Sequence, residues 1–185
     1  MKTIDMRFDE DILRSFVGKT FSEYKCDPFV FTNSVTQIVG LYIDDKVYSM
    51  TNIQESVDYF GDTEDISVCK FKESEKKDIQ SAFKDTEMIS TPVKGIIEKI
   101  LLVNEKQQLF KEGEELYSVW LTRGIVFFVN GREISFEKDI VPFSEEIIIR
   151  RGYSLLRDFS DEKEFLQSWS EEYEPMCNRQ VIEIA

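Results

Sequence analysis

The chain has 185 residues, of which 42% are hydrophobic and 13% aromatic, so it carries enough apolar material for one packed domain and is not a disordered chain. Its 36 acidic and 23 basic side chains give a formal net charge of -13. A field of that sign repels nucleic acid and anionic membrane surfaces, and it favours a basic protein as partner.

The first half of the chain predicts strands and hairpins with two weak helices. Residues 1–8 alternate in part and predict an edge strand, and residues 9–17 predict a short helix. Apolar runs on both sides of Asp44–Lys46 predict a hairpin, and "ISVCKF" (residues 66–71) predicts the strand that follows it. Residues 75–84 have two apolar side chains four positions apart, which predicts a second helix.

The second half predicts a β-meander over residues 95–151. Its clearest signal is "IVFFVNGREISFEK", in which Asn130-Gly131 separates two runs that are typical of strands. Asn-Gly accepts the positive φ angles of a tight hairpin turn. Weaker turn signals at residues 104–106, 111–113 and 122–124 predict further reversals of the chain, and the run "EEIIIRR" predicts the last strand.

A third helix is predicted over residues 161–173, where Phe165, Trp169 and Tyr173 recur every four positions. Glu171 and Glu172 lie near its C-terminal end, where negative charge opposes the helix dipole. A cationic partner would relieve that repulsion, so we interpret the two acids as a partner-binding face. An ordinary solvated helix surface is the alternative.

Two similar phrases suggest an internal repeat: "TEDISV" at residues 63–68 and "SEEIII" at residues 144–149. They fall at equivalent places in two halves, residues 17–86 and 93–174, which match in the order of elements but share few identities. Hairpins share an apolar alternation whatever their ancestry, so duplication and chance both stay open. The apolar residues that close each phrase are expected to face the core.

These elements together predict a mainly β fold. We expect one domain in which two β-meanders pack as a barrel or a sandwich, with two or three short helices. An α+β arrangement is the alternative.

Several kinds of site are excluded by composition. Histidine is absent, which removes Ser-His-Asp and Cys-His catalysis and zinc held by imidazole. Cys26, Cys69 and Cys177 are far apart and form no CxxC motif, so we expect neither a metal nor a cofactor. The first 16 residues carry acids where a signal peptide needs an apolar core, and no apolar run is long enough to span a membrane. We therefore expect a reduced, cytoplasmic protein.

Two groups of charged and aromatic residues are candidate sites. If the halves are related by a two-fold axis, Glu64 and Glu145 could approach each other, and paired carboxylates hydrolyse glycosidic bonds. The simpler interpretation is that both acids mark strand ends. Trp120, Arg123 and Arg132 lie around a predicted hairpin turn, and such residues dominate binding hot spots. Trp120 also fits the core, whereas Arg123 is expected to be exposed.

A third candidate site is a ligand pocket lined by aromatic side chains. Tyr42, Tyr48, Tyr59 and Phe60 all lie in or beside predicted strands, where they could line a cavity in a barrel. Burial in the core is the alternative for each of them.

Three functional hypotheses follow from these observations. The preferred one is a non-enzymatic binding protein whose acidic surface neutralises a basic protein partner, by analogy with immunity proteins that neutralise toxins. The second is a carrier of a small ligand in an aromatic pocket. The third is a carboxylate- or metal-dependent hydrolase that uses Glu64 and Glu145. The oligomeric state has no signal in the sequence.

Overall fold

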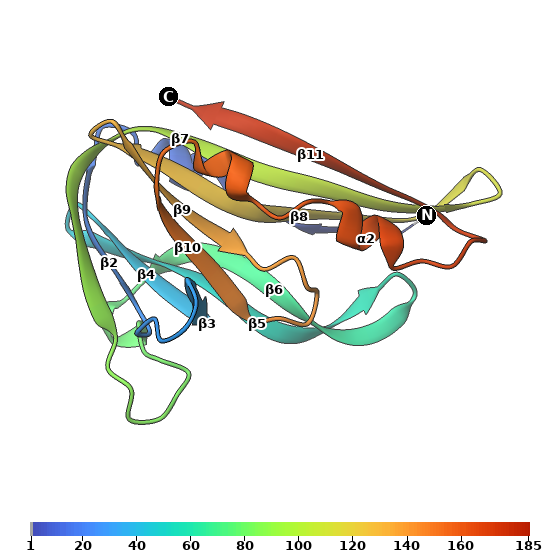
Figure 1. Cartoon of the computed structure of the whole chain (residues 1–185), viewed down its shortest axis with the longest axis horizontal. Helices are drawn as coiled ribbons and strands as arrows, with labels where there is room; N and C mark the ends of the chain where they lie inside the picture. The colour runs from blue at the N-terminus through green and yellow to red at the C-terminus, as the bar shows by residue number, and fades with distance from the viewer. Residues whose placement is uncertain (1) are drawn as a thin grey trace.

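The computed structural model describes residues 2–185 as one large, mostly antiparallel β-sheet, which confirms the predicted mainly β fold (Figure 1). The strands are β1 (Lys2–Met6), β2 (Thr20–Cys26), β3 (Ser34–Thr36), β4 (Ile38–Ile43), β5 (Lys46–Tyr59), β6 (Asp62–Ser74), β7 (Ile89–Lys111), β8 (Glu114–Val129), β9 (Arg132–Lys138), β10 (Glu146–Gly152) and β11 (Glu174–Ile184). The helices are α1 (Glu10–Arg14) and α2 (Lys163–Gln167), with two 3-10 turns, η1 (Lys76–Asp78) and η2 (Leu155–Asp158).

The sheet follows the order β3-β10-β9-β8-β7-β2-β4-β5-β6, with β11 added beside β7 and β1 added in parallel beside β8. The path of paired strands begins at β3 and ends at β6, so the sheet does not close into a barrel. Only Gln37 separates β3 from β4, although β3 pairs with β10 and β4 pairs with β2 and β5. The chain therefore curls the sheet around the core at this point.

The connection between β9 and β10 holds the curled sheet together by hydrogen bonds. The backbone N–H of Gln54 in β5 donates to Glu145 Oε1 at 2.8 Å. The backbone N–H of Ser67 in β6 donates to the carbonyl oxygen of Pro142 at 2.7 Å. Residues 139–145 thus satisfy polar groups that an open sheet would leave without a partner.

The hairpin turns with the strongest local signals are where the sequence predicts them. Asn130 and Gly131 both have positive φ, at 50° and 69°, between β8 and β9. Glu112 and Gly113 do the same between β7 and β8, and Asp44 opens the turn between β4 and β5 with φ 51°. Four of these five positions, all except Glu112, use Asn, Asp or Gly, which tolerate a left-handed backbone.

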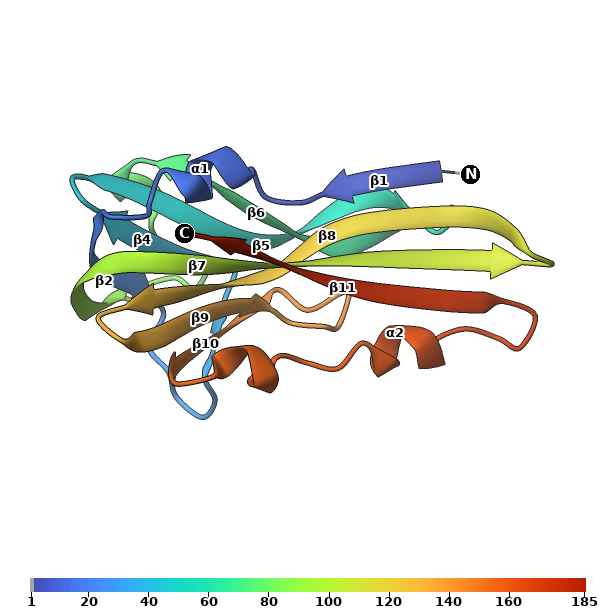
Figure 2. The same cartoon turned by 90° about the horizontal axis from the view of Figure 1, so that it is seen from above.

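The predicted turns at residues 104–106 and 122–124 are wrong. The first lies inside β7 and the second inside β8, and these long strands run side by side toward one end of the molecule in Figure 2. Gly124 is needed for packing and not for a turn, because a Cβ there would collide with the carbonyl oxygen of Phe136 on β9.

The core lies inside the curl and is rich in aromatic side chains. Phe21, Phe127 and Phe136 are fully buried, and the rings of Phe21 and Phe127 lie 5.2 Å apart in an edge-on contact. The apolar residues that close the two similar phrases are buried as predicted: Ile66, Val68, Ile147 and Ile149. In the predicted repeat, the turn at residues 44–45 corresponds to residues 122–123, which lie in the middle of β8 and form no turn. The internal duplication stays a prediction.

The helices are shorter than predicted. Residues 9–17 give a helix only over α1, residues 161–173 only over α2, and residues 75–84 only the 3-10 turn η1. Five-residue helices add few backbone hydrogen bonds, so their packing against the sheet stabilises them. No helix of the described chain, residues 2–185, has the length and apolar character needed to cross a membrane.

Candidate functional site

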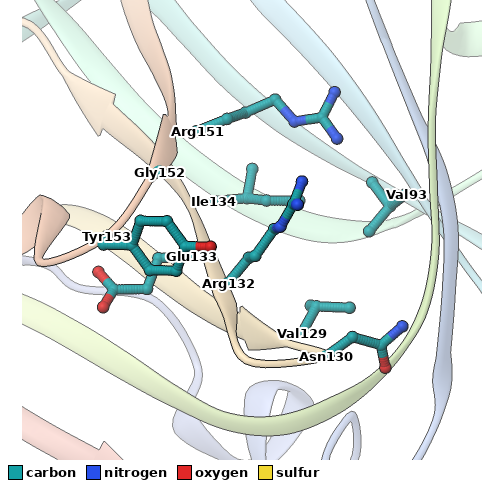
Figure 3. A pocket seen from close by; sticks show the side chains of 9 residues that line it. All are labelled: Val93, Val129, Asn130, Arg132, Glu133, Ile134, Arg151, Gly152 and Tyr153. Carbon is teal, nitrogen blue, oxygen red and sulfur yellow. The ribbon is translucent and has the colours of Figure 1, made fainter.

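A cleft of about 760 Å³ opens at the end of the core beside the β8–β9 hairpin (Figure 3). We call it the arginine cleft. Its apolar lining comes from Val93 on β7, Val129 on β8 and Ile134 on β9. Its polar lining is provided by the side chains of Asn130, Arg132, Glu133, Arg151 and Tyr153, with the backbone of Gly152. The volume lies within the range of about 300–1,000 Å³ that is typical of small-molecule sites.

The pairing of β9 with β10 places both arginines on the side of the sheet that faces the core. Arg151 lies opposite Ile134, and Ile134 is almost fully buried. Arg132 precedes Ile134 by two positions, so its side chain leaves the strand on the same face. Both guanidinium groups project across the cleft in Figure 3. Arginine thus occupies one core-facing position on β9 and one on β10, where the neighbouring core-facing residue Ile134 is apolar.

Neither arginine has a carboxylate oxygen within 4.0 Å in the part of the chain that the structure describes. The nearest acid in sequence, Glu133, uses Oε2 to accept the backbone N–H of Leu155 at 2.7 Å. Its carboxylate points away from the two guanidinium groups in Figure 3. Both arginines are exposed, and they share the cleft with an apolar wall.

The two arginines of the cleft favour an anion. Each guanidinium presents a planar fork of N–H donors that matches the geometry of a carboxylate or a phosphate. The cleft can therefore hold a small anion, with apolar contacts at Val93 and Val129 for its body.

Comparison with known proteins gives no relative: no family, no curated protein and no solved structure matches this chain.

The residues predicted as a binding hot spot do not form one group. Arg132 lines the arginine cleft and is exposed. Arg123 is 1% exposed inside β8, where it donates to Glu105 Oε2 at 2.6 Å, so the prediction of an exposed turn residue is wrong. Trp120 is half-buried on β8 with the guanidinium of Arg7 4.6 Å from its ring centre.

Glu64 and Glu145 lie in different surroundings. Glu64 is exposed on β6, opposite Val57. Glu145 is half-buried, and its carboxylate accepts hydrogen bonds from Gln37 Nε2 at 3.0 Å and from the backbone N–H of Gln54 at 2.8 Å. These bonds give Glu145 a structural role, and neither residue lines the arginine cleft. The hydrolase hypothesis gains no support from this arrangement.

The predicted acidic helix is wrong, because Glu171 and Glu172 follow α2 in a turn before β11. Glu172 forms an ion pair with Lys111 at 2.8 Å. Trp169 and Tyr173 do not continue a helical stripe. Instead Trp169 packs on Phe60 of the β5–β6 turn, with ring centres 5.0 Å apart.

The β5–β6 turn, the β7–β8 hairpin and the segment between α2 and β11 lie together at one end of the molecule (Figures 1 and 2). We call this end the acidic end. Phe60 links the β5–β6 turn to Tyr117 on β8 at 5.5 Å, and the Lys111–Glu172 pair links the β7–β8 hairpin to the segment before β11. Eight acids of this end are mostly or wholly exposed: Asp62, Glu64, Asp65, Glu112, Glu114, Glu171, Glu172 and Glu174.

The four aromatic residues predicted to line a pocket separate into two groups. Tyr48 belongs to the core, where its ring meets Phe16 at 4.6 Å, and Tyr42 is half-buried beneath Lys25. Tyr59 lines a second, smaller pocket, and Phe60 packs beside it. The sequence prediction missed Arg151 and Tyr153. The doublet Arg150-Arg151, directly after three isoleucines, was the available signal.

Proposed function

We propose that this protein is a non-enzymatic, cytoplasmic ligand-binding protein whose arginine cleft takes a small organic anion. The observation that carries this proposal is the pair of guanidinium groups, Arg132 and Arg151, that have no carboxylate partner among residues 2–185 and leave the sheet on its core-facing side in a strongly acidic chain. Two like charges in one cleft repel each other, and a bound dianion would convert that repulsion into attraction.

The lining of the cleft indicates the chemistry of the ligand. Two guanidinium forks suit a phosphate ester or a dicarboxylate, and the apolar wall formed by Val93, Val129 and Ile134 suits a short hydrocarbon body. The described lining contains no Cys or Lys that could act as a nucleophile, and the carboxylate of Glu133 is engaged with Leu155. This composition supports binding and not turnover.

Calorimetric titration with inorganic pyrophosphate and with succinate tests the proposal. We expect saturable binding of at least one of them, weakened about tenfold or more in the double variant Arg132→Gln/Arg151→Gln. Arg157→Gln is the matched control, because Arg157 is an exposed arginine outside the cleft. Binding that is equally weakened in the control, or that persists in the double variant, contradicts the proposal.

A basic protein partner at the acidic end is a second candidate function, an immunity-like role. It is supported by the eight exposed acids that three adjacent connections bring to one end of the molecule. The test is affinity capture from a native lysate with a variant that reverses three of these charges: Asp62→Lys, Glu114→Lys and Glu171→Lys.

The control for that capture has the same net charge but reverses three exposed acids elsewhere: Asp45→Lys, Glu75→Lys and Glu87→Lys. A basic partner retained by wild type and control, and lost by the acidic-end variant, is the expected result. Equal retention by all three proteins would remove the acidic end from consideration.

A further inference from the structure

A second pocket, of about 260 Å³, lies beneath α2 and the β9–β10 connection, far along the sheet from the arginine cleft. We call it the aromatic pocket. Its walls are mainly apolar and aromatic: Tyr59, Ile140, Pro142, Phe143, Phe165 and Trp169. Gln107, Glu164 and Ser168 complete the lining. Phe165 and Trp169 meet with ring centres 5.8 Å apart. The volume is just below the range of about 300–1,000 Å³ for drug-sized ligands, so a one-ring molecule is the size that fits.

The aromatic pocket leads to a small inner cavity of about 20 Å³, with which it shares Tyr59 and Gln107 as well as two apolar residues. The inner cavity has room for one water-sized group. Its lining includes Arg123 and Lys138, whose exposed fractions are 1% and 5%. Two buried cations therefore lie at the inner side of a mainly apolar pocket.

The buried charges around the inner cavity leave one cation, Lys138, without a carboxylate partner among residues 2–185. Glu105 holds two arginines, Arg123 at 2.6 Å and Arg179 at 2.5 Å. Glu137 holds a third, Arg150, at 2.6 Å. Arg179 also lies 3.9 Å from the half-buried Glu162, so three guanidinium groups face three carboxylates before Lys138 is counted. Buried charges are normally paired, so Lys138, the cation that is left over, needs an explanation.

Lys138 adds a fourth cation with no carboxylate oxygen within 4.0 Å among residues 2–185. Its Nζ has one hydrogen-bond acceptor in that range, the carbonyl oxygen of Asp139 at 3.1 Å. Burial, and then the charge of Arg123, lower the pKa of Lys138 to about 8. The ammonium form still predominates at neutral pH, and the inner cavity has surplus positive charge.

Two buried N–H donors along this path also lack acceptors within the described chain. They are Nε of Arg123, at the inner cavity, and Nε1 of Trp169, at the aromatic pocket. An unsatisfied buried donor costs about 1–3 kcal/mol, so native proteins rarely keep one without a role. The unmet groups here are donors and cations, and an acceptor with negative charge would satisfy them.

We propose that the aromatic pocket binds a small aromatic carboxylic acid. Its ring lies among Tyr59, Phe165 and Trp169, and its carboxylate points toward Lys138 and Arg123. The site differs from the arginine cleft in position and in ligand: one ring and one negative charge here, a polar dianion there. It does not depend on the function proposed for the cleft.

Fluorescence of Trp169 reports occupancy directly once the second tryptophan is removed by Trp120→Phe. In that background, benzoate and phenylacetate are titrated against their neutral amides, benzamide and phenylacetamide. We expect at least one acid to give a saturable change, with an affinity about tenfold or more above that of its amide. Equal affinities for acid and amide, or no saturation by either acid below about 10 mM, would overturn the proposal.

Lys138→Met removes the positive charge without unfolding the protein, because a neutral side chain of similar length is easier to bury than an ammonium group. We expect the variant to stay folded and to bind acid and amide alike. Lys77→Met, at an exposed lysine, is the control and keeps the preference for the acid. Arg132→Gln should leave benzoate binding unchanged. Failure of the proposal for the arginine cleft can therefore be distinguished from failure of the proposal for the aromatic pocket. A Lys138→Met protein that retains the acid preference overturns the assignment.

Discussion

Two regions of this molecule carry buried or core-facing arginines, and they differ in whether a carboxylate faces them. Around Arg123, the sheet supplies Glu105 as a partner at 2.6 Å, and Arg179 of β11 binds the same acid. Around Arg132 and Arg151, no acid of residues 2–185 lies within ion-pair distance. The first region ties three strands together, whereas the second keeps its charge available for a ligand.

The largest effect is expected in the paired region, from Glu105→Gln. Burial acts to raise the pKa of Glu105, but Arg123 and Arg179 prevail and hold it below the usual range. Without the carboxylate, both guanidinium groups lose their counter-ion inside the sheet. The free energy of unfolding should fall by about 3–5 kcal/mol, measured by urea denaturation.

The control for this change is Glu183→Gln, which removes an exposed carboxylate from β11 and should leave the urea midpoint nearly unchanged. A Glu105→Gln protein as stable as the control would show that the buried pair contributes little, and the comparison between the two regions would fail.

A smaller effect is expected from the pH dependence of Lys138. Its folded pKa of about 8 lies below the unfolded value of 10.5, so the unfolded chain binds more protons between these values. Stability contributed by this group therefore rises as pH increases from 8 to 10.5, by at most about 3 kcal/mol. The difference in unfolding free energy between wild type and Lys138→Met should shrink over that range, and a constant difference would contradict the assignment.

The smallest effect on stability is expected in the unpaired region. The double variant Arg132→Gln/Arg151→Gln should change the free energy of unfolding by no more than about 0.5 kcal/mol, because neither side chain has an ion-pair partner to lose. Thermal denaturation checks this. A large loss of stability would mean that the two arginines support the fold, and their proposed use for a ligand would lose its basis.

The sequence predicts the parts of this fold that local chemistry decides. Asn130-Gly131 forms the expected hairpin because its residues tolerate positive φ. The two wrong turns have one physical cause: residues that look like turns in isolation pair with each other across β7 and β8. Thr122 donates to Asn104 at 2.8 Å, and Arg123 donates to Glu105, so both polar segments satisfy each other inside the sheet.

The candidate site was only half visible in the sequence for a similar reason. Arg132 was singled out because of its place in a hairpin, and it does line the cleft. Arg151 comes beside it through the pairing of β9 with β10, a register that the sequence does not reveal. The absence of an acid near both side chains depends on the whole curled sheet, and no local pattern encodes it.

The most direct test of the arginine cleft is an NMR titration that follows the Nε–H signals of the arginine side chains as pyrophosphate is added. The account predicts that the Arg132 and Arg151 signals shift together and saturate, while the buried Arg123 signal stays in place. Shifts spread evenly over the exposed arginines, or a saturating change that omits Arg132 and Arg151, would contradict it.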